Sequence, residues 1–259
     1  MESSDRSKLL KRELRMESEL NVTFSRVRGY SLNALIPSLE LDSCSFSSFV
    51  FRMQFAFNSL SIRNSLFSNF DLSDDSINLN ILKAQHPHQR AQIIDTAFHY
   101  ICGTKQGCLL PAFFTTNPAA SLTVARVSGE GFIGRPGSNM FANFNGLLQI
   151  SHSVFSRNHS PNGGVIMTSR RGTTLIAECE FASNSATSGG AFLVDSQSTV
   201  SIANSSFLNN SASAFGGVIS LSGEITLSFL NCTFEANSAG RHGSVLQGHS
   251  KSYELAWNF

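Results

Sequence analysis

The chain has 259 residues, of which 41% are hydrophobic and 14% are charged, and its formal net charge is +1. This length can bury a sizeable core, and 22 Phe residues are the opposite of the low hydrophobicity of disordered chains. The balanced charge excludes a basic field for nucleic acid, and no apolar run reaches the roughly 18 residues of a transmembrane span.

Residues 1–20 form a charged N-terminal segment without the apolar stretch of a signal peptide. Leu9, Met16 and Leu20 share one face of a helix if the segment is helical. One interpretation is a short amphipathic helix that caps the fold, and the other is a solvated terminus.

Residues 21–147 carry a weak repeat. Leu41 precedes Phe46, and Ile62 precedes Phe67, by the same five positions, and the two Phe residues are 21 positions apart. No such register is visible between Phe70 and Leu147. We interpret 21–147 as degenerate coils with long loops.

Residues 148–246 contain four copies of one pattern, in which Phe follows an apolar residue by five positions and precedes Asn by three. The Phe residues are 26, 26 and 27 positions apart, and a glycine-containing turn follows each Asn. The repeated residues are Phe155, Phe181, Phe207 and Phe234; Asn158, Asn184, Asn210 and Asn237; and Gly163, Gly164, Gly189, Gly190, Gly216, Gly217 and Gly243. Residues 247–259 are expected to be a C-terminal tail.

Short alternating runs broken by Gly, Asn and Ser are typical of strands that meet at tight corners. Helical pairs would need a 3.6-residue apolar stripe, which these segments lack. The sequence therefore predicts an all-β fold, a right-handed parallel β-helix in which equivalent residues stack about 4.8 Å apart. The Phe residues should stack inside and the Asn residues should form a ladder at a corner, where Asn tolerates a left-handed conformation. The glycine pairs should allow turns that a Cβ would block.

Five cysteines at uneven spacing do not resemble a disulfide framework. Cys179 and Cys232 occupy the same place two coils apart, about 9–10 Å, which exceeds the roughly 7 Å limit for a disulfide. We expect both to be reduced and packed, with Ser205 in the same place between them.

The paired motifs Phe-x-x-Asn and Gly-Gly-Val/Ala resemble the passenger repeats of chlamydial polymorphic outer membrane proteins and of similar β-helix surface proteins of parasitic protists. The resemblance covers about residues 148–246. It implies a non-catalytic adhesive or display role at the cell surface or in a secreted protein, with surface proteins or glycans as partners.

Two other patterns were weighed as cofactor or metal sites. Gly129-Glu-Gly131-Phe-Ile-Gly134 matches a dinucleotide-binding motif, but Arg135-Pro136 follows where a helix should begin. The set His99, Cys102 and Cys108 lacks zinc-site spacing, and His86 and His88 are expected to be solvated. We expect no catalytic, cofactor-binding or metal-ligating residue.

The alternative is a polysaccharide lyase or hydrolase, since such sites gather carboxylates on one face. The acidic residues of the regular coils are not in register with one another: Glu178, Glu180, Asp195, Glu224 and Glu235. Asp74-Asp75 is the acidic pair elsewhere. A third interpretation is an inactive fragment of a larger repeat protein, whose open C-terminal edge near Leu246 would self-associate.

Overall fold

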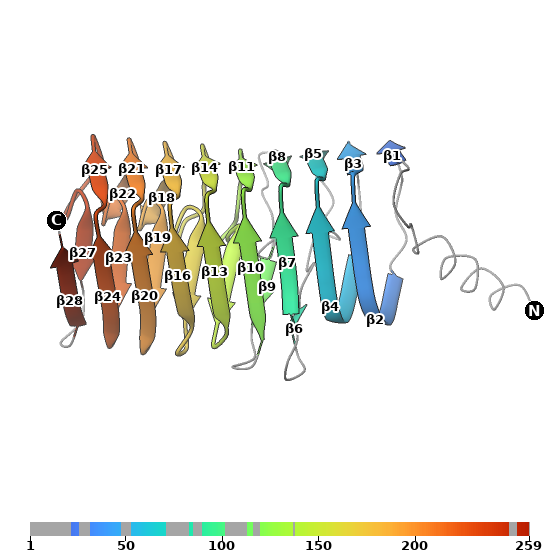
Figure 1. The fold of residues 1–259 in the computed structure, drawn as a ribbon. Coiled ribbons are helices and arrows are strands. Elements are labelled where there is room, and N and C mark those ends of the chain that lie inside the picture. The colour runs from blue at the N-terminus through green and yellow to red at the C-terminus, as the bar shows by residue number, and fades with distance from the viewer. Residues whose placement is uncertain are drawn as a thin grey trace, which may run out of the picture.

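The computed structural model describes residues 22–25, 32–47, 53–70, 83–84, 90–101, 113–115, 120–136, 138–248 and 253–258. These residues wind as a right-handed parallel β-helix, so the predicted fold class is confirmed (Figure 1). The helix considered for residues 1–20 lies outside the described residues.

Every coil contributes strands to sheets that run the length of the solenoid. The narrow sheet consists of β1 (Val22–Ser25), β3 (Cys44–Ser47), β5 (Leu66–Phe70), β8 (Ala97–Ile101), β11 (Ser128–Glu130), β14 (Val154–Ser156), β17 (Glu180–Ala182), β21 (Ser206–Leu208) and β25 (Thr233–Glu235). The wide sheet consists of β2 (Leu32–Asp42), β4 (Met53–Arg63), β7 (Arg90–Ile94), β10 (Ser121–Ala125), β13 (Leu147–Ser151), β16 (Thr173–Ala177), β20 (Ser198–Ala203), β24 (Ile225–Leu230) and β28 (Tyr253–Asn258).

Two further sheets close each coil on the remaining side. The third sheet consists of β6 (Lys83–Ala84), β9 (Phe113–Thr115), β12 (Phe141–Phe144), β15 (Ile166–Ser169), β19 (Phe192–Asp195), β23 (Ile219–Ser222) and β27 (Leu246–Gly248). A short sheet adds β18 (Ser185–Ser188), β22 (Ser211–Phe215) and β26 (Ser238–Ala239). Along a coil, a wide-sheet strand is followed by a narrow-sheet strand and then by a third-sheet strand.

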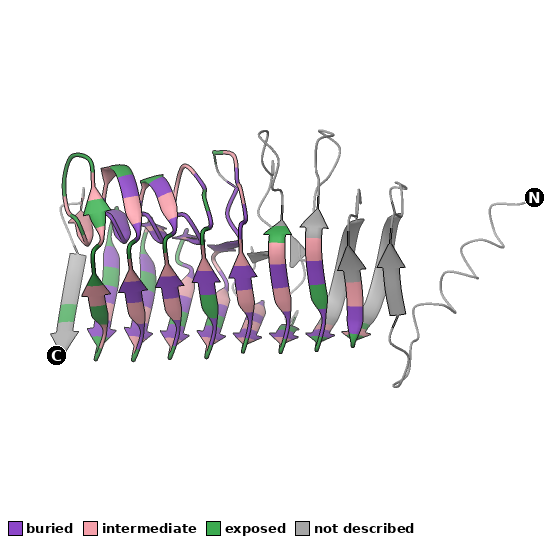
Figure 2. Ribbon diagram, turned by 90° about the horizontal axis from the view of Figure 1, so that it is seen from above, coloured by how far each residue is buried: buried purple, intermediate pink, exposed green. Residues whose placement is uncertain are grey.

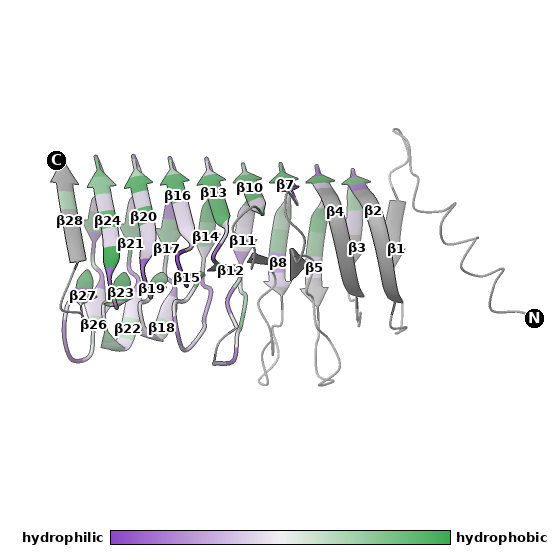
Figure 3. Cartoon of the chain, turned by 90° about the horizontal axis from the view of Figure 1, so that it is seen from below, coloured by the Kyte–Doolittle hydropathy of each residue, from purple (hydrophilic) through white to green (hydrophobic). Residues whose placement is uncertain are grey.

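The core lies inside the coils because alternate residues of each strand point inward. In β13, Leu148 and Ile150 are buried while Gln149 is exposed, and the same alternation recurs in β10 and β24. Figure 2 shows this alternation of buried and exposed residues, and Figure 3 shows hydrophobic residues along the wide sheet. The interior is therefore lined by rows of aliphatic side chains, one residue per coil.

Residues in the left-handed conformation make the corners on both sides of the narrow sheet. One residue per coil lies in the interior row of the narrow sheet, for example Phe98, Gly129 and Phe181. Three positions before this residue, φ is about +50°, as at Asp95, Arg126 and Glu178. Two positions after it, φ is again positive, as at Arg157 and Ala236. The repeated asparagines were expected to take this conformation, but the residue before each of them does, which leaves the Asn side chain free to turn inward.

The coils continue in register through the segment where the sequence shows no repeat. Phe67 pairs with Phe98, Phe98 with Gly129, and Gly129 with Phe155. The repeat is not visible in this part of the sequence because equivalent positions there are 31 residues apart instead of 26, as at Asp95 and Arg126.

The expected tail, residues 247–259, also contains strands. β28 pairs in parallel with β24, and Leu255 lies opposite Leu227. Because Tyr253, Leu255 and Trp257 alternate with other residues in the same phase as the preceding wide strand, the tail prediction was wrong for residues 253–258.

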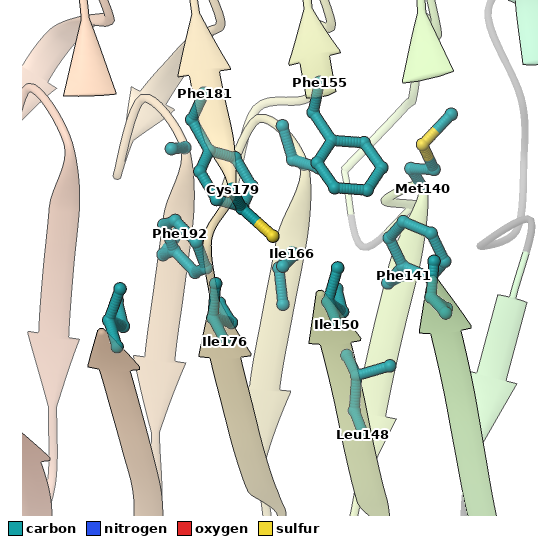
Figure 4. Packing of buried hydrophobic residues seen from close by; sticks show 14 of the residues in the cluster. Met140, Phe141, Leu148, Ile150, Phe155, Ile166, Ile176, Cys179, Phe181 and Phe192 are labelled. Carbon is teal, nitrogen blue, oxygen red and sulfur yellow. The ribbon is translucent and has the colours of Figure 1, made fainter. Parts of the chain in front are cut away.

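The four repeated Phe residues form a stack in the interior (Figure 4 shows its first two rings). The ring centroids of Phe155 and Phe181 are 5.3 Å apart, those of Phe181 and Phe207 are 5.3 Å apart, and those of Phe207 and Phe234 are 4.9 Å apart. The first three rings are fully buried and Phe234 is half-buried. Each buried ring contributes roughly 2–3 kcal/mol from its area.

The asparagine ladder runs beside this stack. Nδ2 of Asn184 donates to the carbonyl of Phe155 at 2.9 Å and to Oδ1 of Asn210 at 3.0 Å. Its Oδ1 accepts from the backbone N–H and from Nδ2 of Asn158, both at 3.0 Å. Asn158, Asn184 and Asn210 are fully buried, so the ladder satisfies polar groups that water does not reach.

The glycine pairs have the expected role. Gly163 has φ +70°, and a Cβ on Gly164 would lie 2.1 Å from the carbonyl oxygen of Gly190. A side chain at the second glycine would therefore push successive coils apart.

The cysteines near the narrow sheet lie in a buried row of small side chains. Cys44, Cys179 and Cys232 are free thiols. The backbone N–H of Cys179 donates to Oγ of Ser205 at 3.1 Å, and Ser205 Oγ donates to the carbonyl of Ala203 at 2.7 Å. Cys179 is buried and Cys232 half-buried, with Ser205 in the same place between them.

Candidate functional site

The outer face of the narrow sheet gathers most of the described ion pairs. One edge of this face is the corner that precedes each narrow strand, where left-handed residues project one side chain per coil. We call this row the charged corner, and it consists of Asp95, Arg126, His152, Glu178, Asn204 and Asn231.

Neighbouring side chains of the charged corner bind each other in pairs. Arg126 donates to both carboxylate oxygens of Asp95, at 2.5 and 2.8 Å. This hydrogen bonding lowers the pKa of Asp95 and raises the pKa of Arg126. His152 Nδ1 lies 2.9 Å from Glu178 Oε2, and Asn231 Nδ2 donates to Asn204 Oδ1 at 3.0 Å.

A second group of polar residues lies at the opposite edge of the same face, and we call it the Glu130 cluster: His99, Tyr100, Glu130 and Arg157. Glu130 Oε1 lies 2.8 Å from Arg157 Nη1, and its Oε2 lies 3.5 Å from His99 Nδ1. The ring of Tyr100 covers Gly131, where a Cβ would lie 2.7 Å from Tyr100 Cδ1. The missing side chain at Gly131 thus makes room for an aromatic ring on the surface.

Large side chains with apolar surface are also exposed on this face. Tyr100 is 49% exposed and Val154, in β14, is 43% exposed. Leu66, the first residue of β5, is also exposed. The face therefore combines an aromatic ring, aliphatic groups and arginines, which are the residues that dominate the energy of protein interfaces.

Three carboxylates of this face, those of Asp95, Glu130 and Glu178, lie against an arginine or an imidazole. Glu180 and Glu235 also lie at outward positions of the narrow strands. A general acid in a glycosidase requires a carboxyl group with a raised pKa, whereas the pKa of Asp95 is lowered. Within the described residues, no three His, Cys, Asp or Glu side chains gather closely enough to hold a metal ion. The arrangement is suited to hydrogen bonding and apolar contact with a partner.

The residues weighed as chemical candidates are dispersed in the structure. Glu178 is in the charged corner, Glu180 is on β17, and the Gly-x-Gly-x-x-Gly segment begins in strand β11. His99 Nδ1 lies 3.5 Å from Glu130 Oε2. Six of the candidates lie outside the described residues: Asp74, Asp75, His86, His88, Cys102 and Cys108.

Sequence reasoning missed the residues that form this face. Asp95, Arg126 and Glu130 lie in coils whose length differs from the 26-residue repeat, so their alignment was not visible. The 31-residue separation of Asp95 and Arg126 is the signal that identifies them, once Phe98 is recognised as a partner of Phe67.

Comparisons with known proteins address the family. A protein-family model described as "right handed beta helix region" matches residues 124–256, just over half of the chain. Searches of curated proteins and of solved structures gave no significant match. In the part of the chain that the structure describes, no helix is long and apolar enough to cross a membrane. The family match and the stacked parallel strands agree, and the chain belongs to the right-handed β-helix family.

Proposed function

We propose that this chain is a non-catalytic, adhesin-like binding module of a surface or secreted protein, and that it binds a partner protein along the outer face of the narrow sheet. The observation that carries the proposal is the Tyr100 ring on Gly131, next to the Arg157–Glu130 ion pair. An aromatic group and an arginine fixed by backbone and carboxylate need little ordering when a partner binds.

The distribution of charge supports binding over catalysis. Two arginine–carboxylate pairs and the His152–Glu178 contact join successive coils, so three carboxylates of the long face already have partners. The resemblance to polymorphic outer membrane protein repeats supports the same role, because the Phe-x-x-Asn and Gly-Gly motifs serve packing and leave the outer face free to vary.

A binding screen with the full chain tests this function. The chain would be applied to an array of extracellular proteins and glycans, beside the variant Tyr100→Ala/Arg157→Ala. The matched control is Gln149→Ala, which removes an exposed side chain from the wide sheet. We expect the first variant to lose at least tenfold in affinity for the bound protein and the control to keep it.

An assay for unsaturated uronate and for reducing sugar, run on the same preparations, tests the alternative. If the chain turns over a polysaccharide and Glu130→Gln or Glu178→Gln abolishes this turnover, the proposed binding function is wrong and the chain is an enzyme. If Tyr100→Ala/Arg157→Ala binds the partner as tightly as the wild type, the partner does not bind at the narrow-sheet face.

A further inference from the structure

A hollow of about 470 Å³ lies at the corner between the third sheet and the wide sheet. This corner is at the end of the wide strands away from the charged corner, so the hollow is separate from the face discussed above. Its lining comes from four successive coils: Asn145, Arg170, Arg171, Ser196, Gln197, Gly223 and Glu224. We call this surface the arginine corner.

The backbone presents these side chains to solvent. Arg170 and Arg171 follow β15 with φ of 54° and 68°, and Ser196 and Gln197 follow β19 with φ of 50° and 56°. Two consecutive left-handed residues turn the chain sharply into the next strand. Their side chains project outward, and both arginines and Gln197 are exposed.

Hydrogen bonds join three of these side chains across the coils. Arg171 Nε donates to Gln197 Oε1 at 3.0 Å, and Gln197 Nε2 donates to Glu224 Oε2 at 3.2 Å. The chain of bonds holds the Arg171 guanidinium through its Nε. The Nη groups at the other edge of the guanidinium can then donate to a ligand. It also places a cation at one end of the hollow and a carboxylate at the other.

Arg170 is held differently, by an aromatic ring. Its Cζ lies 5.6 Å from the centroid of the Phe144 ring, a cation–π contact. Among the described residues, no carboxylate lies within salt-bridge distance of Arg170 or Arg171. Two adjacent guanidinium groups are therefore oriented by neutral partners and keep their charge for another anion.

The chemistry of the hollow defines what fits it. Guanidinium groups match the planar geometry of carboxylates and the oxygens of sulfate with paired N–H donors. The amide and hydroxyl groups of Asn145, Gln197 and Ser196 suit the hydroxyl groups of a sugar. The coils repeat about every 4.8 Å, a spacing close to that of successive rings in an extended oligosaccharide. Glu224 repels a second anionic group at the far end. Asp195 adds to this repulsion, because its Oδ1 would lie 3.6 Å from a Cβ on Gly223.

We propose that the arginine corner binds an acidic oligosaccharide. One uronate carboxylate or sulfate group lies against Arg170 and Arg171, and neutral sugar rings extend along Gln197 toward Glu224. This is a binding site for a carbohydrate, separate from the protein-binding face of the narrow sheet, and it does not depend on that face.

Titration calorimetry with the full chain tests the proposal, using three probes of matched length. The probes are an oligosaccharide with one terminal uronate, the same oligosaccharide with one sulfate, and its neutral analogue. We expect the two anionic probes to bind at least tenfold more tightly than the neutral one, with an affinity that falls as salt is added. The stronger of the two anionic probes identifies the acidic group.

Variants locate the site. Arg170→Gln/Arg171→Gln should weaken the anionic probes at least tenfold, and Gln already occupies a left-handed position of this corner at Gln197. Arg241→Gln is the matched control, because Arg241 is also exposed and its Cζ lies 5.8 Å from the centroid of the Phe215 ring.

Four results would overturn the inference. They are equal affinity for the neutral and anionic probes, undiminished binding by the double arginine variant, the same loss in Arg241→Gln, and absence of binding by all three probes. Circular dichroism melting curves that coincide with the wild type show that each variant is folded. The Tyr100→Ala/Arg157→Ala variant should bind the acidic probes normally, which separates failure here from failure of the proposed function.

Discussion

Met140 fills the place in the phenylalanine stack that Gly129 leaves empty. A Cβ on Gly129 would lie 2.8 Å from Met140 Sδ and 2.8 Å from Phe155 Cδ1. The Phe155 ring is tilted 25° from that of Phe181, whereas Phe181 and Phe207 are within 7° of parallel. Met140, directly before β12, and Phe155, in β14, thus compensate for one missing ring, and Figure 4 shows Met140 beside the stack.

The middle of the stack should be the most sensitive part of the core. Phe181→Ala removes a fully buried ring that contacts Phe155, Phe207 and Phe192, and we expect a loss of about 3–5 kcal/mol in the free energy of unfolding. Phe234→Ala is the control, because Phe234 is half-buried and should cost less. Urea denaturation followed by circular dichroism measures both losses. Equal losses would contradict the expectation that a more deeply buried ring contributes more to the free energy of unfolding.

The asparagine ladder should fail when one rung is removed. Asn184→Ala leaves the backbone N–H of Asn158 without its acceptor and removes a hydrogen bond from the carbonyl of Phe155. Oδ1 of Asn210 loses one of two donors and still accepts from the backbone N–H of residue 184. Since a buried unsatisfied group costs about 1–3 kcal/mol, we expect a loss of about 1–3 kcal/mol in unfolding free energy. Asn237→Ala, at a half-buried rung, should cost less in the same urea titration. A loss below about 1 kcal/mol for Asn184→Ala would show that water replaces the amide.

Cys179 should make the fold sensitive to alkali. Burial raises the pKa of its thiol from 9.0 to about 11. Below pH 9 the thiol is protonated in both states, and between pH 9 and pH 11 only the unfolded chain loses the proton, so the unfolding free energy falls as pH rises across this window. Two pKa units correspond to about 2–3 kcal/mol.

Cys179→Ser should reduce that fall, because the hydroxyl can donate to the carbonyl of Ala177 as Ser205 does to Ala203. The reverse change, Ser205→Cys, places a further buried thiol in the same row and should enlarge the fall. Unfolding free energies from urea titrations at pH 8, 9, 10 and 11 give the comparison. Parallel curves for the wild type and Cys179→Ser would refute the assignment.

The sequence predicts those parts of the fold in which one residue type repeats at a fixed interval. Phe181 and Asn184 were assigned because their partners recur at the same spacing in the neighbouring coils. Gly129 and Met140 could not be assigned in this way, because each differs in type from the equivalent residue of the neighbouring coils. Their complementary volumes become visible only when the strands are aligned. The arginine corner was missed for a related reason: Arg171, Gln197 and Glu224 differ in type and interact only because the coils place them one above another.

The left-handed corners offer a stabilising substitution. Ala236 is exposed with φ +52°, a conformation that costs a residue with a Cβ about 1–2 kcal/mol. Ala236→Gly should therefore raise the unfolding free energy by about 0.5–1 kcal/mol after the entropy of glycine is counted. Ala182→Gly, within strand β17, is the control and should lower it by about 0.5–1 kcal/mol. Thermal melts of both variants measure the difference, and a destabilised Ala236→Gly would contradict a strained corner.

Restoring the missing ring tests the compensation at the break in the stack. Met140 pairs in position with Val165 of the next coil, so the substitutions Gly129→Phe and Met140→Val together recreate the regular pattern. Met140→Val alone should cost about 1–3 kcal/mol through the cavity it opens, and Gly129→Phe alone should cost about 1–3 kcal/mol through overpacking against Met140. In the double variant the added ring fills the cavity that Met140→Val opens. Its loss of unfolding free energy should therefore be smaller than the sum of the two single losses by at least about 1 kcal/mol. A double-mutant cycle in urea measures this coupling. Additive losses would mean that Met140 and Gly129 do not share one space, and that the tilt of Phe155 has another cause.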